Sequence, residues 1–454
     1  MRFAQQAQDA PIGQDTLAEL RRIDGRPDAR ATLTVAVGHV VAMLMGNITP
    51  AMLIASTLGL SAADQGILVQ SAMLMAALST VMQLFSYAGL GMGLPTVMGV
   101  GFVYVPVLTI IGVQHGIAAI FGAQLASGVV SILVGLAMHK IRRFFPPIVT
   151  GTVVLAIGVS LYSTAVNYIG GGSAAMAAGT FGSPEFLLVA AVTLAVTLAC
   201  GFLGRGAVKV SGMIIGIAVG LVLSLALGLV DFSGLSSASW LSVPRPLYFG
   251  IEFHADAVAL MSLVCIVNAV QMVGCVSSTT IGALGREATA AEIGGSIKAL
   301  GLSCMLGSLF GGLPTTIYGQ NVGLIATSRM IARRAFIAVS AILLVLGLSP
   351  KLAALAAAIP LPVLGGATAT VFAVIAVSGI ELICQQPFTY RNKIIVGVSL
   401  ALGMGVGSVP EILQFTPQVV QNVFGSSLVV SFIFVFALNI LIPETDADRA
   451  SEEE

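Results

Sequence analysis

Charged side chains are scarce in this sequence. They make up 9% of its 454 residues, whereas hydrophobic residues make up 57% and the mean hydropathy is +1.01. Because a soluble globular domain carries roughly 25% charged residues, this deficit excludes an ordinary soluble protein. Acidic and basic residues are equal in number, 20 of each. The sequence has no excess of basic residues, which a nucleic-acid-binding protein would need. We therefore expect no nucleic-acid partner.

Signatures of metal, disulfide and nucleotide chemistry are missing as well. The five cysteines show no C-x-x-C spacing, the four histidines do not pair at ligand spacing, and no G-x-x-x-x-G-K-[ST] loop occurs. A membrane enzyme would need a nucleophile with a base, or a metal cluster. We therefore expect no metal, no cofactor, no ATP-driven step and no enzymatic activity.

Long apolar runs are what the sequence has in abundance. Runs of ~17–25 apolar residues indicate membrane-spanning helices, and fourteen can be counted here, two of them short and polar (95–112 and 314–331). They predict an all-α polytopic membrane protein with fourteen spans. The runs are 34–56, 66–87, 95–112, 116–138, 147–167, 185–204, 210–230, 256–281, 292–310, 314–331, 335–349, 360–380, 393–409 and 425–443.

The basic residues are unevenly divided between the two predicted sides of the membrane. With a cytoplasmic N-terminus, seventeen fall on the cytoplasmic side, Arg245 and Lys351 on the far side, and Lys298 within a span. This asymmetry obeys the positive-inside rule and favours an even number of spans with both termini in the cytoplasm. The charged segment 1–30 lacks the apolar core of a signal peptide. We expect a multi-pass protein of the plasma, or inner, membrane.

An internal repeat relates the two halves of the chain. "GLPTVMGVGF" at 93–102 and "GLPTTIYGQN" at 312–321 share four residues 219 positions apart, and "PPIVTGTVV" at 146–154 resembles "LPVLGGATA" at 361–369. Two ordered similarities at nearly one offset favour duplication over chance likeness among Gly- and Pro-rich helices. Seven spans in each half would make the halves inverted repeats, an architecture common in secondary transporters.

The domain boundaries follow from the repeat. We predict a cytoplasmic N-terminal segment, a first repeat of spans 1–7, a linker, a second repeat of spans 8–14 and an acidic C-terminal tail. These segments are 1–30, 31–230, 231–254, 255–443 and 444–454.

The two short, polar spans both open with Gly-Leu-Pro-Thr. Pro95 and Pro314 remove a backbone donor and disfavour helix before them. Each span should therefore begin as extended chain and become helical near the middle of the membrane, where non-helical backbone is tolerated only inside protein or beside a cavity. The two helix N-termini, with their free N–H groups, would form a polar pocket. Alternatively, the polar side chains there only satisfy the broken backbone.

"GQNVGLIATSR" at 319–329 resembles the Q-N-x-G-x-x-x-x-T-R signature of the nucleobase–ascorbate transporter family, the xanthine/uracil permeases, with Ser328 in place of Thr. The likeness covers nearly the whole chain. "VGHVVAMLMGNITPAML" resembles the first helix of the family, retaining His39, and "GVGFVYVPVL" resembles its third-helix segment, with Phe102 retained and Tyr104 for Phe. "FPPIVTGTVV" and "LQFTPQVVQNVF" look most like the xanthine and urate branch.

The resemblance implies a fold and a set of site residues. Family members have two inverted sets of seven spans, a core of spans 1–4 and 8–11, a gate of spans 5–7 and 12–14, and often dimerise through the gate. We expect a homodimer whose pocket lies in the core. The candidate substrate-binding residues are Gln271, Gln320, Phe102, Gly101, Gly319, Asn321, Tyr104, Cys275 and His39.

Each candidate has an expected role. Gln271 and Gln320 would hydrogen-bond the edge of a heterocycle, since a primary amide offers both donors and an acceptor. Phe102 would stack on the ring, and backbone N–H groups near Gly101 and Gly319 would complete the contacts. For three other candidates a structural role competes with substrate contact: His39 could hold a helix in place, Asn321 could brace the half-helix, and Cys275 could be simple packing.

The chain departs from the family where an acid is expected. Gln271 stands at the place of the eighth-helix Glu, Cys275 at that of an acidic or His residue, and Leu300 at that of the ninth-helix Asp. No acidic residue lies inside spans 8–10; Asp256 and Glu292 sit at helix ends. A buried carboxylate is the ordinary proton carrier of such sites. We therefore expect proton symport by the usual route to be weakened or absent.

These observations lead to one predicted function. The chain should be a secondary or facilitative transporter of a purine base such as xanthine or urate, working by alternating access, with the coupling ion (H⁺, Na⁺ or none) left open. The runner-up is an inorganic or organic anion carrier of the same fold, and a uracil permease is a further alternative. A channel or a non-transporting sensor is disfavoured by the inverted repeat, although not decisively.

Overall fold

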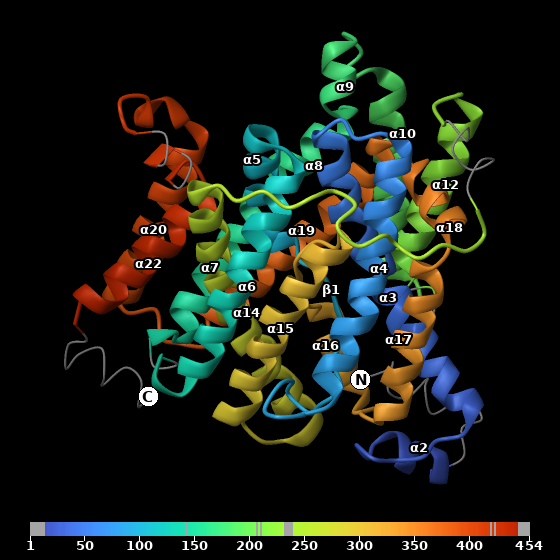
Figure 1. Cartoon of the computed structure of the whole chain (residues 1–454), viewed down its shortest axis with the longest axis vertical. Helices are drawn as coiled ribbons and strands as arrows, with labels where there is room; N and C mark the ends of the chain where they lie inside the picture. Colours follow the sequence, from blue (N-terminus) through green and yellow to red (C-terminus); the bar gives the residue numbers. More distant parts are fainter. Residues whose placement is uncertain are drawn as a thin grey trace.

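A computed structural model describes residues 14–141, 144–205, 208, 211–230, 239–417, 420–421 and 424–443. Long helices run roughly parallel and antiparallel to one another, with α2 at one end of the molecule and α9 at the other (Figure 1). The predicted tail at 444–454 and residues 231–238 of the predicted linker lie outside the described residues.

The first half of the chain contains a short N-terminal helix and then the apolar helices. They are α2 (Gln14–Leu20), α3 (Ala29–Thr57), α4 (Ala62–Leu84), the 3-10 turn η1 (Phe102–Tyr104), α5 (Val105–His115), α6 (Ile117–Ile141), α7 (Pro147–Ser160), α8 (Tyr162–Ile169), α9 (Gly172–Ala177), α10 (Pro184–Leu203) and α12 (Gly212–Ala226).

The second half repeats this order. Its helices are α14 (Ala255–Leu284), α15 (Ala290–Phe310), α16 (Gly319–Ser328), α17 (Arg333–Gly347), α18 (Pro350–Ala357), α19 (Leu361–Ile383), α20 (Tyr390–Ser408), the 3-10 turn η3 (Pro410–Leu413) and α22 (Ser427–Leu441).

Eight of the described helices are long and apolar enough to cross a membrane. A ninth span results if α17 and α18, which meet at a bend of 82°, are taken together. The chain is thus a multi-pass helical membrane protein. The other predicted runs fall on shorter apolar helices, on α20 and on two strand–helix segments. The bend into α18 was not predicted.

Two short strands pair with each other, and β1 lies near the middle of the molecule (Figure 1). β1 (Met98–Val100) follows Pro95, β2 (Thr315–Ile317) follows Pro314, and the two pair antiparallel with Met98 opposite Ile317. The predicted change from extended chain to helix is therefore present in both segments. Met98 and Ile317 are also 219 residues apart, the offset of the repeat. This one pair of equivalent residues faces each other, as expected where a two-fold axis between inverted halves passes through the strand pair.

The described helices fall into two sets by their contacts. In one set α3, α4, α5 and α6 pack with α14, α15, α16 and α17; in the other α7, α10 and α12 pack with α19, α20 and α22. Helices of different sets touch more sparsely, mainly through α14 against α7. The predicted separation into a core of spans 1–4 and 8–11 and a gate of spans 5–7 and 12–14 stays a prediction.

The N-terminal segment is attached to the rest of the molecule. The carbonyl of Leu20, at the end of α2, accepts the N–H groups of Ile331 and Ala332 just before α17. From the start of α17, the guanidinium of Arg333 donates to the carbonyls of Leu84 and Gly93 at 3.1 and 3.0 Å. One arginine thus joins the end of α4 and the approach to β1 to the second half of the chain.

Candidate functional site

Two asparagines hold the crossing strands. Asn47 of α3 accepts the N–H of Val100 at 2.7 Å. Asn268 of α14 donates to the carbonyl of Thr315 at 3.2 Å, and its Oδ1 accepts the hydroxyl of Thr316 at 2.6 Å. Both asparagines are fully buried. Because an unpaired polar backbone group is costly inside a membrane protein, these side chains stabilise the strands at that depth.

The asparagines are a repeat-related pair that the sequence analysis missed. They lie 221 residues apart, close to the 219-residue offset of the strands. An asparagine at matching places in the first helix of each repeat was the signal available in the sequence. The two asparagines differ in their other hydrogen-bond partners. Asn268 also donates to the hydroxyl of Tyr104 at 2.9 Å, whereas the second partner of Asn47 is the sulfur of Met73 at 3.3 Å.

Tyr318 fills the space that its counterpart in the first repeat leaves open. Its hydroxyl donates to the carbonyl of Val100 at 2.8 Å. A Cβ placed on Gly99, the residue 219 positions earlier, would lie 2.4 Å from a Tyr318 ring carbon and 2.8 Å from Asn47 Oδ1. The strand pair has room for one side chain at this point. Tyr318 of the second repeat supplies that side chain, and Gly99 of the first repeat has none.

The start of α16 presents an open polar surface. Gly319, Gln320 and Gly323 are exposed on this helix, while Asn321 is buried. Among the described residues, no acceptor lies within hydrogen-bond reach of the N–H groups of Gly319 and Gln320. The Gln320 amide makes one long contact, 3.4 Å to the carbonyl of Ala42. Donors without protein partners at a helix N-terminus suit a ligand with acceptor atoms.

Asn321 and His39 form a brace next to this surface. Asn321 Nδ2 donates to the carbonyl of His39 at 3.0 Å and lies 3.0 Å from His39 Nδ1. The His39 side chain is 4% exposed, and its ring packs on Phe336 with centroids 4.8 Å apart. These contacts favour the structural alternative for both residues: they fix α16 against α3.

Gln271 and Cys275 follow Asn268 along α14, about one and two turns further on. The Gln271 Oε1 atom is buried and has no hydrogen-bond partner in the described part of the chain. Gln271, Gly274, Cys275 and Ser278 share one helix face by their spacing. Gly274 and Ser278 also line a cavity of about 520 Å³ between α14, α7 and the end of α19.

Two candidates of the first repeat are placed differently from what was expected. The N–H of Gly101 donates to the carbonyl of Pro314 at 2.9 Å, extending the strand pairing, so it is not available to a ligand. Tyr104 is fully buried, and its hydroxyl accepts from Asn268. Both residues lie in the framework behind the site.

Phe102 lies where the two sets of helices meet. Its ring is 5% exposed and packs edge-on against Phe372 of α19, with centroids 5.2 Å apart and planes at 80°. Stacking on a ligand, as expected from the sequence, would require α19 to uncover the ring face.

The carboxylates of α14 and α15 are held at the helix ends, remote from Gln271. Asp256, in the first turn of α14, lies 2.9 Å from His115 Nε2. Glu292 forms a capping box with Thr289 at the start of α15 and pairs with Arg286. At the predicted position of the ninth-helix acid, Leu300 is fully buried. The candidate site, as drawn from these residues, therefore offers mainly amides, glycines and backbone donors.

With this geometry described, comparisons with known proteins identify the family. The Xan_ur_permease family model, described as "Permease family", matches residues 30–412. The chain belongs to the nucleobase–ascorbate transporter family. It is a membrane permease and not an enzyme.

Relatives align with it over almost their whole length. Xanthine permease XanP of Escherichia coli strain K12 is 31% identical over 451 residues, covering 95% of this chain and 96% of the relative. Uric acid permease PucK of Bacillus subtilis strain 168 is 33% identical over 414 residues, with 91% and 95% covered. Nucleobase transporter PlUacP of Paenibacillus larvae is 33% identical over 432 residues, with 93% and 98% covered.

Solved structures place the fold in a wider group of transporters. The transmembrane domain of the cyanobacterial bicarbonate transporter BicA matches with a TM-score of 0.51 at 15% identity, covering 92% of this chain and 100% of that one. The murine anion transporter Slc26a9 in the inward-facing state matches with a TM-score of 0.62 at 14% identity, covering 94% and 70%. At such identities the likeness concerns the fold alone.

Proposed function

We propose that this chain transports an oxidised purine base, xanthine or urate, by alternating access. The supporting observation is the set of unpaired polar groups beside the crossing strands: the Gln271 carbonyl oxygen on α14 and the free N–H groups of Gly319 and Gln320 on α16. A purine-dione carries ring N–H donors and exocyclic carbonyl acceptors on adjacent edges. The relatives named as xanthine and uric acid permeases support the same substrate class.

The proposed contacts divide between the two helices. Gln271 Oε1 accepts a ring N–H, which explains why a buried oxygen is left without a protein partner. The Gln320 amide and the N–H of Gly319 bind exocyclic oxygens at the positive end of α16. Cys275 gives an apolar wall, and Phe102 covers the ring when α19 moves away.

The membrane arrangement follows from topology and charge. We propose fourteen spans, with the two strand–helix segments counted as the third and tenth, both termini in the cytoplasm, and location in the plasma or inner membrane. α3, α4, α5, α6 and α14–α17 form the transporting core, and the other set of helices forms the gate. The cavity between α14, α7 and α19 then opens to the cytoplasm. As in the family, the gate would form a homodimer.

Coupling should differ from that of a carboxylate-based symporter. With Gln271, Cys275 and Leu300 at the three expected acidic places, the site has no group that titrates as a carboxylate does. Urate and xanthine are weak acids, and a monoanion would be favoured by the N-terminus of α16. We propose that the substrate carries its own charge and follows its electrochemical gradient.

The second candidate function is transport of an inorganic or organic anion, because solved structures of anion transporters have a similar fold. Proteoliposomes should be assayed with labelled xanthine, urate, uracil and sulfate at equal concentration. The proposal expects uptake of xanthine or urate, competition between these two, weaker uptake of uracil and no uptake of sulfate. Sulfate uptake without purine uptake would establish the anion carrier instead.

A further inference from the structure

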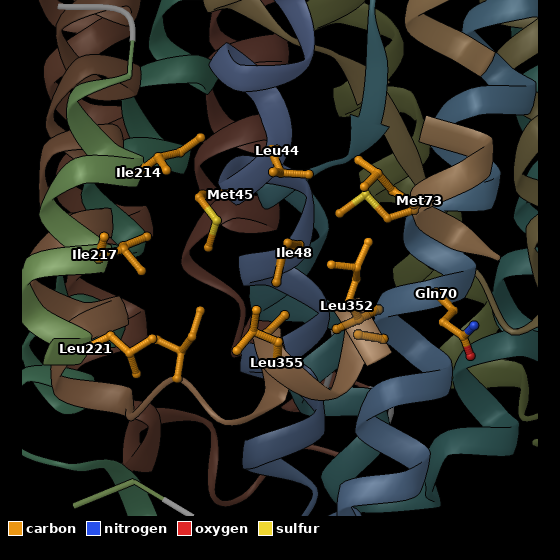
Figure 2. A pocket seen from close by; sticks show the side chains of 16 residues that line it. Leu44, Met45, Ile48, Gln70, Met73, Ile214, Ile217, Leu221, Leu352 and Leu355 are labelled. Carbon is orange, nitrogen blue, oxygen red and sulfur yellow. The ribbon is translucent and has the colours of Figure 1, made fainter. Parts of the chain in front are cut away.

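An apolar groove between α12 and α3 has no role in the proposed transport. It encloses about 240 Å³ and is lined by side chains of α3, α4, α12, α17 and α18. Figure 2 shows Ile214, Ile217 and Leu221 of α12 on one side and Met45 and Ile48 of α3 facing them. The groove therefore lies between a helix of one set and helices of the other.

The lining of the groove selects for hydrocarbon. Its one strongly polar side chain is Gln70, which is 3% exposed. The Gln70 amide already donates to the carbonyl of Gly347 at 3.2 Å and to the hydroxyl of Ser242 at 3.4 Å. The remaining lining residues are aliphatic or Met. An occupant of this space would be held by van der Waals packing, with no free polar group in the lining to orient it.

A basic residue, Lys351, directly precedes a lining residue of the groove in the sequence. α18, which turns by 82° from α17, contributes Leu352 and Leu355 to the lining and places Lys351 immediately beside them. The Lys351 ammonium lies 4.2 Å from the ring centroid of Trp240, the single tryptophan of the chain. Trp240 is 76% exposed, as expected of an aromatic at the membrane–water boundary.

Two basic residues near the groove favour an occupant with a negatively charged headgroup. Lys351 and Arg245 are the two basic residues predicted on this side of the membrane, and both lie on segments next to the groove, α18 and the segment that carries Trp240. The N–H of Ser242, between Trp240 and Arg245, donates to the carbonyl of Leu348 at 2.9 Å, which fixes this segment over the bend. An apolar slot with a cation beside its lining is complementary to an acyl chain whose headgroup carries a phosphate.

We propose that this groove binds one membrane phospholipid, with an acyl chain between α12 and α3 and its phosphate at Lys351. The site is separate from the purine site, so it stands whether or not the proposed substrate is right. Because α3 and α12 belong to different helix sets, the acyl chain would occupy space that changes when the two sets move against each other.

Native mass spectrometry of the full-length protein can test this. The protein is purified in mild detergent with equal amounts of phosphatidylglycerol and phosphatidylethanolamine added. We expect one retained phospholipid on the wild type, with phosphatidylglycerol preferred. Ala218→Trp, which fills the groove from α12, should lower retention about tenfold, since several buried methylenes would lose their contacts. The matched control is Val222→Trp, one turn along the same helix and outside the lining, which should leave retention unchanged.

A charge variant tests the headgroup separately. Lys351→Gln should remove the preference for phosphatidylglycerol, while Lys393→Gln, an exposed lysine on α20, should keep it. Equal retention by the wild type and Ala218→Trp would overturn the acyl-chain site. Equal binding of the two lipids by the wild type would overturn the assignment to Lys351.

A second measurement covers the case in which Ala218→Trp fails to fold. The wild type is irradiated with a phospholipid that carries a diazirine near the end of one acyl chain, and labelled peptides are identified. Labelling concentrated on α12 and α18 supports the proposal. Labelling spread evenly over all lipid-facing helices overturns it.

Discussion

The two strand–helix segments at the centre of this permease have the same order of backbone elements, but their side chains differ. The first, β1 with α5, offers Gly99, Gly101 and Phe102; the second, β2 with α16, offers Tyr318, Gln320 and Asn321 at the equivalent positions. Tyr318 occupies the space above Gly99, and the Gly101 N–H is used in strand pairing while the Gln320 N–H has no acceptor among the described residues.

This difference shows how a duplicated element can become specialised. The first copy supplies room and a buried aromatic ring, and the second supplies hydrogen-bonding groups. An inverted repeat fixes where the two copies meet, since both backbones are required for the strand pair. It leaves the side chains free to diverge. We therefore expect substitutions at equivalent positions of the two copies to have unequal and predictable effects.

The largest effect should come from removing the second copy's amide. Gln320→Ala leaves substrate acceptors unpaired, at roughly 1–3 kcal/mol for each unmet group, and should lower purine uptake about 10- to 100-fold. Uptake by proteoliposomes, normalised to reconstituted protein, is the measurement. Gln414→Ala, an exposed amide remote from the site, is the control. Wild-type affinity in Gln320→Ala would mean that the site lies elsewhere.

The next effect concerns the space in the first copy. Gly99→Ala places a methyl group against the Tyr318 ring and should destabilise the protein by about 1–3 kcal/mol, the usual range for overpacking. A Cβ on Gly319 would meet nothing within 4 Å, so Gly319→Ala should keep wild-type stability. Thermal unfolding in detergent distinguishes them. Equal Tm values for the two variants would contradict the proposal that the first segment supplies space and the second supplies hydrogen-bonding groups.

A smaller asymmetry is expected between the two bracing asparagines. Asn268→Leu removes contacts to Thr315, Thr316 and Tyr104, while Asn47→Leu removes one backbone contact and one to a sulfur. At about 1 kcal/mol for each lost hydrogen bond, Asn268→Leu should lower Tm more. The reverse order would show that β1, and not β2, limits the stability of the crossing.

The smallest expected effect is on coupling. With the membrane potential clamped, an imposed inward proton gradient should leave purine uptake by the wild type nearly unchanged. Gln271→Glu introduces the carboxyl group that the family resemblance leads one to expect there, and a carboxyl group inside a membrane protein is a common proton carrier. Uptake by this variant should increase with the gradient. Protonophore-sensitive uphill uptake by the wild type would disprove uncoupled transport.

Much of the backbone could be predicted from local signals. Pro95 and Pro314 indicated the two extended segments, and the common offset of the Gly-Leu-Pro-Thr copies indicated a duplication. The antiparallel pairing of the two segments was not predicted. The family signature located α16. The role of Arg329, the last residue of that signature, became visible only in the structure: it ends α16 in a left-handed conformation, with φ of 55°.

Contacts across the two halves were beyond the reach of sequence reasoning. Asn47, Asn268 and Tyr318 act on residues far away in the chain, and no local pattern shows which strand they reach. Tyr104 and Gly101 were placed at the substrate because their neighbour Phe102 matches the family. Their buried positions depend on α14 and on Pro314, which only the folded chain brings to them.

The strand pair also bears on how the protein is made. β1 leaves the ribosome more than two hundred residues before its partner β2. Until then the N–H of Gly101, next to β1, lacks the Pro314 carbonyl to which it donates, at a depth where lipid offers no acceptor. The first repeat cannot complete its centre on its own, so insertion of the early helices should stay reversible until β2 arrives. A chain truncated before residue 315 would therefore keep β1 without its partner strand.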